Sequence, residues 1–258
     1  MSAIHLAAAT LVAGAMLALW ALSLRLRDVS LVDVYWGPGF AAIAWTSVAV
    51  AGPSPRGVLA ALLATAWGTR LAVHLARRRR GAGEDRRYAA MRAARGDRFP
   101  LVSLFTVFLL QGVLSFTVSL PLQAAATGRG GPLGLLDVAG AGLAVAGMVF
   151  ETVADAQLAR FLERPGSRGL VMQEGLWRWS RHPNYFGDFV VWWGLGLLGA
   201  SAGAPGTLLG PLVMSVLLLR VSGVALLEKT IGERRPGYAD YAARTSAFLP
   251  LPPRTLRS

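Results

Sequence analysis

The stretch Gly175-Leu-Trp-Arg-Trp-Ser-Arg181-His182-Pro183-Asn184-Tyr185-Phe-Gly187-Asp188 places basic, amide, phenol and carboxylate groups at the start of a long apolar run. Proline suits the first turn of a helix, where its missing N–H group costs no hydrogen bond. The sequence therefore predicts a helix that starts at His182 and continues through Leu198. A cluster of polar groups at the end of such an apolar helix indicates a charged ligand.

The polar residues of this helix would lie in two groups. Asn184, Asp188 and Trp192 are spaced i, i+4, i+8 and so share one face. Three further residues would surround the positive N-terminus of the helix, where an anion is favoured: Arg178, Arg181 and His182.

The composition is typical of a membrane protein. The 258 residues are 54% hydrophobic and the mean hydropathy is +0.48, which is too apolar for an ordinary soluble domain. Seven apolar runs come close to the ~20 residues that a bilayer requires: Ala3–Leu24, Val34–Ala51, Val58–Leu75, Leu101–Ala125, Leu133–Ala156, Asn184–Ala200 and Thr207–Leu227. We expect an all-α, polytopic integral membrane protein, a single domain over residues 1–258 whose seven or so transmembrane helices enclose a cytoplasm-facing cofactor cavity.

The basic residues gather on one side of this arrangement. They come from four segments: Arg25 and Arg27; Arg77 to Arg80, Arg86, Arg87, Arg92, Arg95 and Arg98; Arg160, Arg164, Arg168, Arg178 and Arg181; and Lys229, Arg234, Arg235, Arg244, Arg254 and Arg257. The other side has only Arg56 and Arg129. By the positive-inside rule we expect the N-terminus outside and the C-terminus in the cytoplasm, in a bacterial inner membrane. Loop arginines also attract anionic lipid, whereas we expect no nucleic-acid partner.

Redox and metal chemistry have little support in the composition. The chain has no cysteine and three histidines, so it offers no thiolate nucleophile, and we expect no metal site.

Ionisable side chains inside the apolar runs are costly there and mark functional sites. One predicted helix carries Trp67, Arg70, His74 and Arg77 as a polar stripe, and another carries Glu151 and Asp155 at i, i+4. These charges could simply pair with one another. Their number and their position toward the cytoplasm favour a polar cavity, in which arginines suit phosphates and carboxylates suit ribose hydroxyls. A nucleotide cofactor and a lipophilic substrate from the bilayer would fit such a cavity.

These residues carry a family resemblance. The matching elements are Glu151, Asp155, Arg164-Pro165-Gly166, Gly175-Leu-Trp, Arg181 to Tyr185, Gly187-Asp188, Arg220, Pro236 to Tyr241 and Phe248-Leu-Pro250, with weaker matches at Asp33 to Gly37 and Gln111-Gly112. The chain resembles the steroid 5α-reductase superfamily, in particular its bacterial branch of uncharacterised membrane proteins, the DUF1295-like group. The resemblance implies an NADPH-dependent enzyme that transfers hydride to the carbon–carbon double bond of a lipophilic enone.

The same resemblance implies roles for individual residues. The expected NADPH-binding residues are Asp155, Arg164, Arg178, Arg181, His182, Asn184, Tyr185, Asp188, Arg220, Tyr238 and Tyr241. The expected substrate-binding residues are Trp36, Gln111 and Trp192. Asp33 would polarise the substrate carbonyl, supported by Tyr35 or His74, because the family's tyrosine on the third helix has no counterpart here. A structural role is the alternative: Asp33 would cap a helix or pair with Arg70, and Tyr35 and Trp36 would anchor the membrane interface.

Two other functions remain open. The Arg-His-Pro-x-Tyr element is shared with S-adenosylmethionine-dependent membrane methyltransferases that resemble isoprenylcysteine carboxyl methyltransferase, although their paired glutamates are replaced here by Glu228-Lys229. A non-enzymatic lipid-binding or transport protein is the third possibility. In each case we expect membrane lipids as partners and a monomer.

Overall fold

The computed structural model describes residues 2–167, 169–221, 223–224, 228, 231 and 235–254. This part of the chain is helical and has no strand, only an isolated bridge between Ser180 and Ser246. The predicted all-α class is therefore confirmed. Four basic residues of the predicted charge pattern lie outside the described residues: Arg168, Lys229, Arg234 and Arg257.

The chain divides into two compact units, which are described separately. Unit 1 comprises Met1–Ala141 and Leu195–Gly210, and unit 2 comprises Gly142–Gly194 and Pro211–Ser258. Whether they form the single domain that the sequence predicts stays a prediction.

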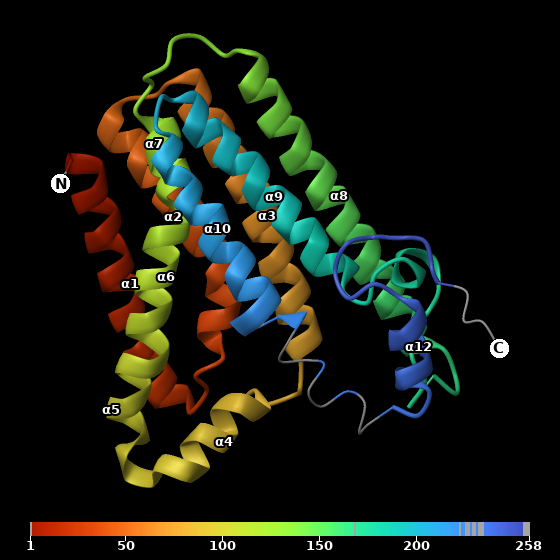
Figure 1. The fold of residues 1–258 in the computed structure, drawn as a ribbon. Helices are drawn as coiled ribbons and strands as arrows, with labels where there is room; N and C mark the ends of the chain where they lie inside the picture. The colour runs from red at the N-terminus through yellow and green to blue at the C-terminus, as the bar shows by residue number, and fades with distance from the viewer. Residues whose placement is uncertain are drawn as a thin grey trace. The chain divides into compact units, whose positions relative to one another are not determined.

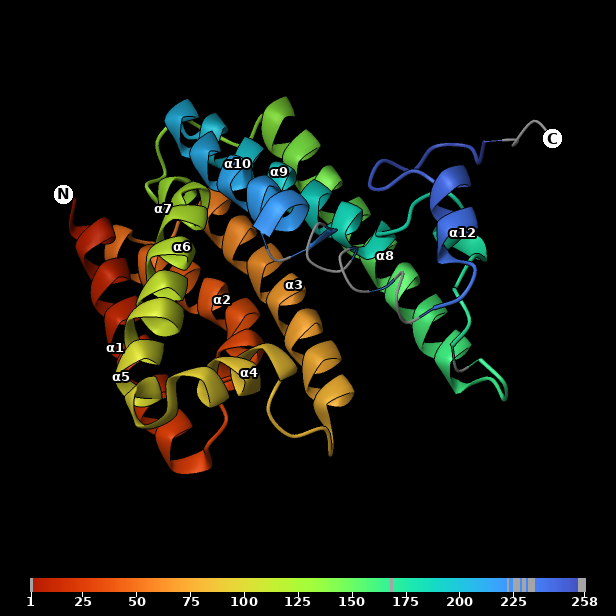
Figure 2. The same ribbon diagram turned by 60° about the horizontal axis from the view of Figure 1, so that its bottom comes forward.

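Unit 1 is built around three long antiparallel helices that are followed by a short surface helix (Figure 1). The elements are α1 (Ala3–Leu26), α2 (Leu31–Ala51), α3 (Pro55–Arg79), α4 (Arg86–Arg95), η1 (Gly96–Arg98), α5 (Phe99–Ser103), a π-helical segment η2 (Leu104–Leu109), α6 (Leu110–Val118), α7 (Leu120–Ala126) and η4 (Pro205–Leu208). Figure 2 shows α4 lying across the same end of the unit as the C-terminal ends of α1 and α3.

Glycines allow α2 and α3 to pack closely. A Cβ atom added to Gly37 would lie 2.4 Å from the carbonyl oxygen of Gly68, so a larger residue would force the helices apart. The helix α3 starts where the sequence offers both a cap and a proline: the Ser54 side chain accepts a hydrogen bond from the Gly57 N–H, and Pro55 occupies the first turn.

Unit 2 contains most of the long helix α8. Its elements are α8 (Leu135–Glu163), η3 (Gly175–Arg178), α9 (Pro183–Ser201), α10 (Leu209–Val216), a π-helical segment η5 (Leu217–Val221) and α12 (Tyr238–Arg244); α8 and α9 each have one end in unit 1. A second glycine pair brings α8 and α9 together, because a Cβ atom on Gly147 would lie 2.6 Å from the Gly187 carbonyl oxygen.

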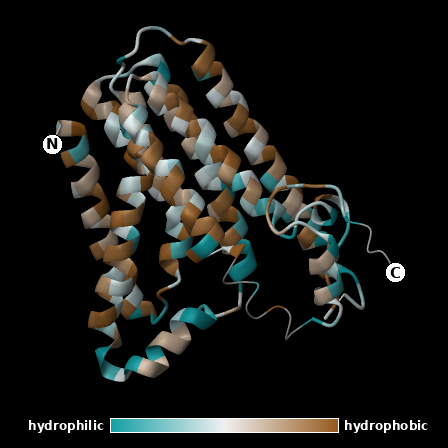
Figure 3. Cartoon of the chain, viewed as in Figure 1, coloured by the Kyte–Doolittle hydropathy of each residue, from teal (hydrophilic) through white to brown (hydrophobic). Residues whose placement is uncertain are grey.

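Within the described residues, five helices are long and apolar enough to cross a membrane. They are Ala3–Leu26, Leu31–Ala51, Pro55–Arg79, Arg86–Val118 and Leu135–Glu163, and Pro205–Val221 is a shorter apolar helix. The chain thus has the helices of a multi-pass membrane protein, whereas the predicted number of seven is not confirmed. Along unit 1, apolar helices give way to hydrophilic residues at α4 (Figure 3).

The helix boundaries required corrections. The third predicted run extends from Val58–Leu75 to Pro55–Arg79, and the fifth continues past Ala156 to Glu163. Both extensions run into polar sequence, because arginine, alanine and leucine favour helix after the apolar run has ended. The fourth predicted run, Leu101–Ala125, is interrupted at Ser119, one residue before α7, which has Pro121 in its first turn. The helix α9 starts at Pro183, one residue later than predicted.

Candidate functional site

Four polar residues lie around the close contact between α8 and α9 in unit 2, and we call them the α8–α9 cluster: Glu151, Asp155, Asn184 and Asp188. The Asn184 amide donates a hydrogen bond from Nδ2 to Oδ1 of Asp155 at 3.1 Å. Glu151, Asp155 and Asp188 are 4%, 7% and 8% exposed. Three carboxyl groups are thus buried on one helix pair.

The predicted faces explain this arrangement. Glu151 and Asp155 are one turn apart on α8, as Asn184 and Asp188 are on α9. Trp192 lies one further turn along α9 and is fully buried. Tyr185 lies on the adjacent face, with its ring stacked on that of His182 at a centroid distance of 5.7 Å.

The start of α9 is tied to the C-terminal part of unit 2. The Ser180 hydroxyl donates to the Phe248 carbonyl oxygen at 2.8 Å, and the Arg181 N–H donates to the Ser246 carbonyl oxygen at 2.8 Å. His182 then donates its backbone N–H to the Ser180 hydroxyl at 3.1 Å. These bonds fix where the Arg181 and His182 side chains lie.

Glu228 is the acceptor for three of the predicted site residues. Arg181 donates from Nη2 to Oε2 at 3.1 Å, His182 Nε2 lies 3.1 Å from Oε1, and the Tyr238 hydroxyl donates to Oε1 at 3.3 Å. Burial lowers the pKa of His182 against the opposing effect of Glu228, so the imidazole favours its neutral form. Burial and the nearby Glu228 charge raise the pKa of Tyr238 to about 12.

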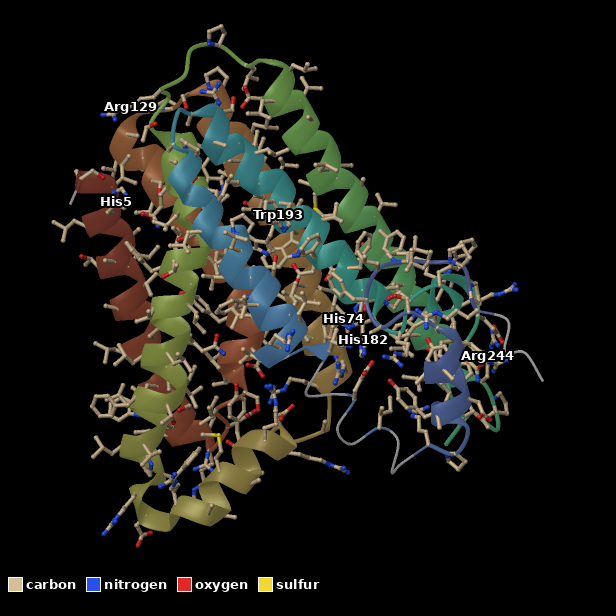
Figure 4. All side chains as sticks on the ribbon, viewed as in Figure 1. His5, His74, Arg129, His182, Trp193 and Arg244 are labelled. Carbon is tan, nitrogen blue, oxygen red and sulfur yellow. The ribbon has the colours of Figure 1, made fainter. Side chains whose placement is uncertain are left out.

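The remaining predicted cofactor-binding residues of unit 2 differ in environment. Tyr241 is buried and donates its hydroxyl hydrogen bond to the Trp177 carbonyl oxygen, and burial raises its pKa. Arg164 forms an exposed ion pair with Glu174 at 2.9 Å. Arg178 and Arg220 have exposed side chains, on η3 and η5. Figure 4 labels His182 close to the start of α9 and Arg244 on α12.

In unit 1, Asp33 lies in the first turn of α2 and binds two residues around the start of α4. The Tyr88 hydroxyl donates to Oδ1 at 2.8 Å, and Arg87 Nη2 lies 3.1 Å from Oδ2. The hydrogen-bond partners of Asp33 are therefore Tyr88 and Arg87, and not the Arg70 of the structural alternative. The catalytic roles expected of Asp33 and of Tyr35 or His74 stay predictions.

The other predicted residues of unit 1 lie on three helices. Trp36 packs edge-on against Phe40, at a ring-centroid distance of 5.0 Å, and Phe40 in turn packs against Trp67 at 5.9 Å. Tyr35 is half-buried on α2, His74 lies on α3, and Gln111 is half-buried on α6.

The sequence predicts a polar loop over Arg77 to Arg98 but gave no role to the acidic residues that precede α4. Glu84 receives two hydrogen bonds from Arg92, at 2.8 and 3.0 Å, and one from the Val29 N–H at 2.9 Å. The Arg92 hydrogen bonds lower the pKa of Glu84. Asp28 binds Arg79 at 2.6 Å; burial alone would raise the pKa of Asp28, but bonds from Arg79 and Ser30 lower it. The pair Glu84-Asp85, which interrupts the arginine run, was the available signal.

Among the described residues, no group of three or more His, Cys, Asp or Glu side chains could hold a metal ion.

Comparison with known proteins identifies the family. A family profile described as "Protein of unknown function (DUF1295)" matches residues 19–245. No curated protein and no solved structure gave a significant match. Because the profile covers most of the chain, including α2 to α12, the protein belongs to the DUF1295 family, the group that its sequence motifs resemble.

Proposed function

We propose that the protein is a membrane-embedded, NADPH-dependent reductase of the carbon–carbon double bond of a lipophilic enone. The observation that carries the proposal is the α8–α9 cluster, which gathers three buried carboxyl groups and an amide on one helix pair. Such groups persist at functional sites.

The residues of unit 2 fit a phosphorylated nucleotide in their chemistry. Asp155 and Asp188 offer carboxylate oxygens to hydroxyl and carboxamide donors, and the Asn184 amide offers both donor and acceptor. Arg178 carries an exposed guanidinium group suited to phosphate. The Arg164 guanidinium group lies over the Phe161 ring, 5.9 Å from its centroid, and forms an exposed ion pair with Glu174. An exposed ion pair contributes at most about 1 kcal/mol, so it can be exchanged for a phosphate contact.

Arg181 and His182 have a different role in this proposal. Glu228 already binds both side chains, so their charge is compensated within the protein. They orient the start of α9 and keep Asn184 in position. Tyr238 and Tyr241 support the same segment through Glu228 and the Trp177 carbonyl oxygen.

NADPH supplies the hydride when it is bound. The protein must stabilise the negative charge that develops on the substrate carbonyl oxygen, which a well-placed hydrogen-bond donor does. We assign this donor to Tyr88. In the free protein the single hydroxyl hydrogen of Tyr88 bonds to Asp33. In the proposed reaction this hydrogen turns to the substrate carbonyl oxygen, and a protonated Asp33 carboxyl group donates to the Tyr88 oxygen in its place, while Arg87 donates to the other Asp33 oxygen.

A methyltransferase is the second candidate, and one observation favours it. Glu228 joins the Arg-His-Pro element to the last part of the chain by binding both Arg181 and His182. The methyltransferases that share this element carry glutamates at the corresponding position and use S-adenosylmethionine, so the same residues suit that cofactor.

Ligand-dependent unfolding of the purified protein in detergent distinguishes these functions. A ligand at 100 times its dissociation constant adds about 2.7 kcal/mol of apparent stability. The reductase proposal predicts that NADPH raises the melting temperature and that S-adenosylmethionine does not. The opposite result favours the methyltransferase, and stabilisation by lipid alone favours a non-enzymatic lipid-binding protein.

A further inference from the structure

We propose that one end of unit 1 carries a binding surface for the phosphate groups of anionic membrane lipids, independent of the proposed enzyme activity. We call it the arginine rim, and it consists of six exposed arginines: Arg25, Arg27, Arg77, Arg80, Arg95 and Arg98. They belong to the C-terminal ends of α1 and α3 and to the region where α4 passes into η1.

Ion pairs within unit 1 show that these segments meet. Asp28, just after α1, binds Arg79 at the end of α3 at 2.6 Å. The Val29 N–H donates to Glu84, which in turn binds Arg92 on α4. The same end of the unit is hydrophilic in Figure 3, where α4 joins the end of α3. The rim is therefore a feature of one face of the fold, although its arginines are far apart in the sequence.

The acidic residues of this region form ion pairs with arginines that are not part of the rim. Asp28 binds Arg79, Glu84 binds Arg92, and Asp85 and Asp33 share Arg87. Within the described part of the chain none of the six rim arginines forms an ion pair, and the only further acid between α3 and α5 is the exposed Asp97. The rim therefore has an excess of positive charge at the surface.

The position of the rim relative to apolar surface indicates a lipid rather than a dissolved anion. The exposed face of α3 contains Leu62, at 54% exposure, and Val73, at 43%, and Arg77 and Arg80 continue that face one and two turns later. The same transition occurs where Arg98 comes one turn before Leu101, which is 62% exposed.

Other apolar residues extend this exposed surface. Phe105 and Leu109 follow Leu101 at helical spacing and are 56% and 52% exposed. An apolar surface that faces acyl chains and ends in arginines places their guanidinium groups at the depth of the lipid phosphates.

The test measures which lipids associate with the full-length protein after reconstitution into phosphatidylcholine bilayers. Spin-labelled phosphatidylglycerol and spin-labelled phosphatidylcholine are compared by electron spin resonance, which gives their relative association constant. One arginine near an anionic surface contributes about a five-fold preference. We expect the parent protein to favour phosphatidylglycerol by at least this factor. A parent protein without any preference would overturn the proposal.

A matched pair of variants locates the preference. The combined change of all six rim arginines to glutamine should bring the ratio close to one, and the corresponding lysine variant should retain it. Arg129→Gln is the control, because Arg129 is exposed at the other end of unit 1 (Figure 4), and it should leave the ratio unchanged. A folded glutamine variant with the parent ratio would exclude the rim.

Salt and free phosphate complete the test on the parent protein, so that the result does not depend on how well the variant folds. Raising the salt from about 0.1 M to about 1 M shortens the screening length from about 10 Å to about 3 Å, and the preference should fall with it. A preference that persists at high salt would contradict the proposal. If inorganic phosphate at constant ionic strength abolishes the preference, the rim binds free phosphate rather than lipid.

Discussion

The Tyr88 hydroxyl donates a hydrogen bond to Oδ1 of Asp33 at 2.8 Å, and this bond joins α4 to the first turn of α2. Tyr88 is 7% exposed, so its hydroxyl group needs the bond, since leaving a buried donor unpaired is costly. In the proposed reaction, Tyr88 together with Asp33 supplies the hydrogen bond that stabilises the negative charge on the substrate oxygen.

Tyr88→Phe removes the proposed hydrogen-bond donor and leaves the ring in place. We expect NADPH binding to be retained and turnover of a lipophilic enone to fall by a factor of about 10²–10³, the typical cost of losing an oxyanion donor. Cofactor oxidation measured with a panel of enones checks this. Asp33→Asn should act in the same direction, because the amide orients the Tyr88 hydroxyl less well.

The two substitutions also separate catalysis from structure. A Tyr88→Phe protein with unchanged turnover would remove the pair from the mechanism. Loss of NADPH binding together with turnover would instead assign Asp33 and Tyr88 a structural role.

The ion pair of Arg56 and Asp137 should be the most sensitive electrostatic contact of unit 1. The side chains are 2% and 1% exposed, with Nε–Oδ1 and Nη2–Oδ2 distances of 2.8 and 3.0 Å. Asp137→Asn leaves a buried guanidinium group without its charge partner and should destabilise the protein by about 3–5 kcal/mol. Thermal unfolding in detergent measures the loss.

The exposed pair of Arg164 and Glu174 is the control, and Glu174→Gln should cost at most about 1 kcal/mol. Replacing both members of the buried pair, as in Arg56→Met with Asp137→Leu, should recover much of the lost stability. If Asp137→Asn and Glu174→Gln lower the stability equally, the buried pair does not contribute more to stability than the exposed pair.

The close approach of α8 and α9 should tolerate no side chain at Gly147. Gly147→Ala places a Cβ atom 2.6 Å from the Gly187 carbonyl oxygen and should destabilise the protein by about 1–3 kcal/mol through overpacking. Gly142→Ala, on the same helix with no atom within 4 Å, should instead be stabilising by about 0.5–1 kcal/mol. If the two alanine variants unfold alike, the glycine contact does not set the helix spacing.

The distribution of arginines predicts how the protein is oriented in the membrane. Because of the positive-inside rule, a reporter fused after Arg95 should report from the cytoplasm, and one fused after Gly131 should report from outside. External activity at Arg95 would reverse the proposed orientation.

The sequence predicted those parts of the structure that depend on local spacing. The pairs Glu151 with Asp155 and Asn184 with Asp188 were predicted from a one-turn separation, and α8 and α9 bring both pairs together. The partner of Asp33 could not be found this way, since Tyr88 lies 55 positions away on a separate helix. The same holds for Arg181 and Glu228, which are 47 positions apart.

Hydropathy alone also could not predict where the helices end. The ends of α3 and α8 lie in arginine-rich and mixed polar sequence, where the backbone continues as a helix without an apolar pattern. Hydropathy alone also does not settle the number of membrane-crossing helices, because α9 carries polar groups in its first turns.

Nucleotide binding to the α8–α9 cluster tests the central claim most directly. Titration calorimetry of NADPH with the purified parent protein, with Asn184→Ala and with Asp188→Ala gives the dissociation constants, and Arg129→Gln, an exposed position in unit 1, serves as the control. The account predicts that the parent protein binds NADPH, that Arg129→Gln binds it equally well, and that each cluster variant weakens binding by about 1–3 kcal/mol. If both cluster variants fold and bind NADPH like the parent, or if the parent binds S-adenosylmethionine and not NADPH, the account is contradicted.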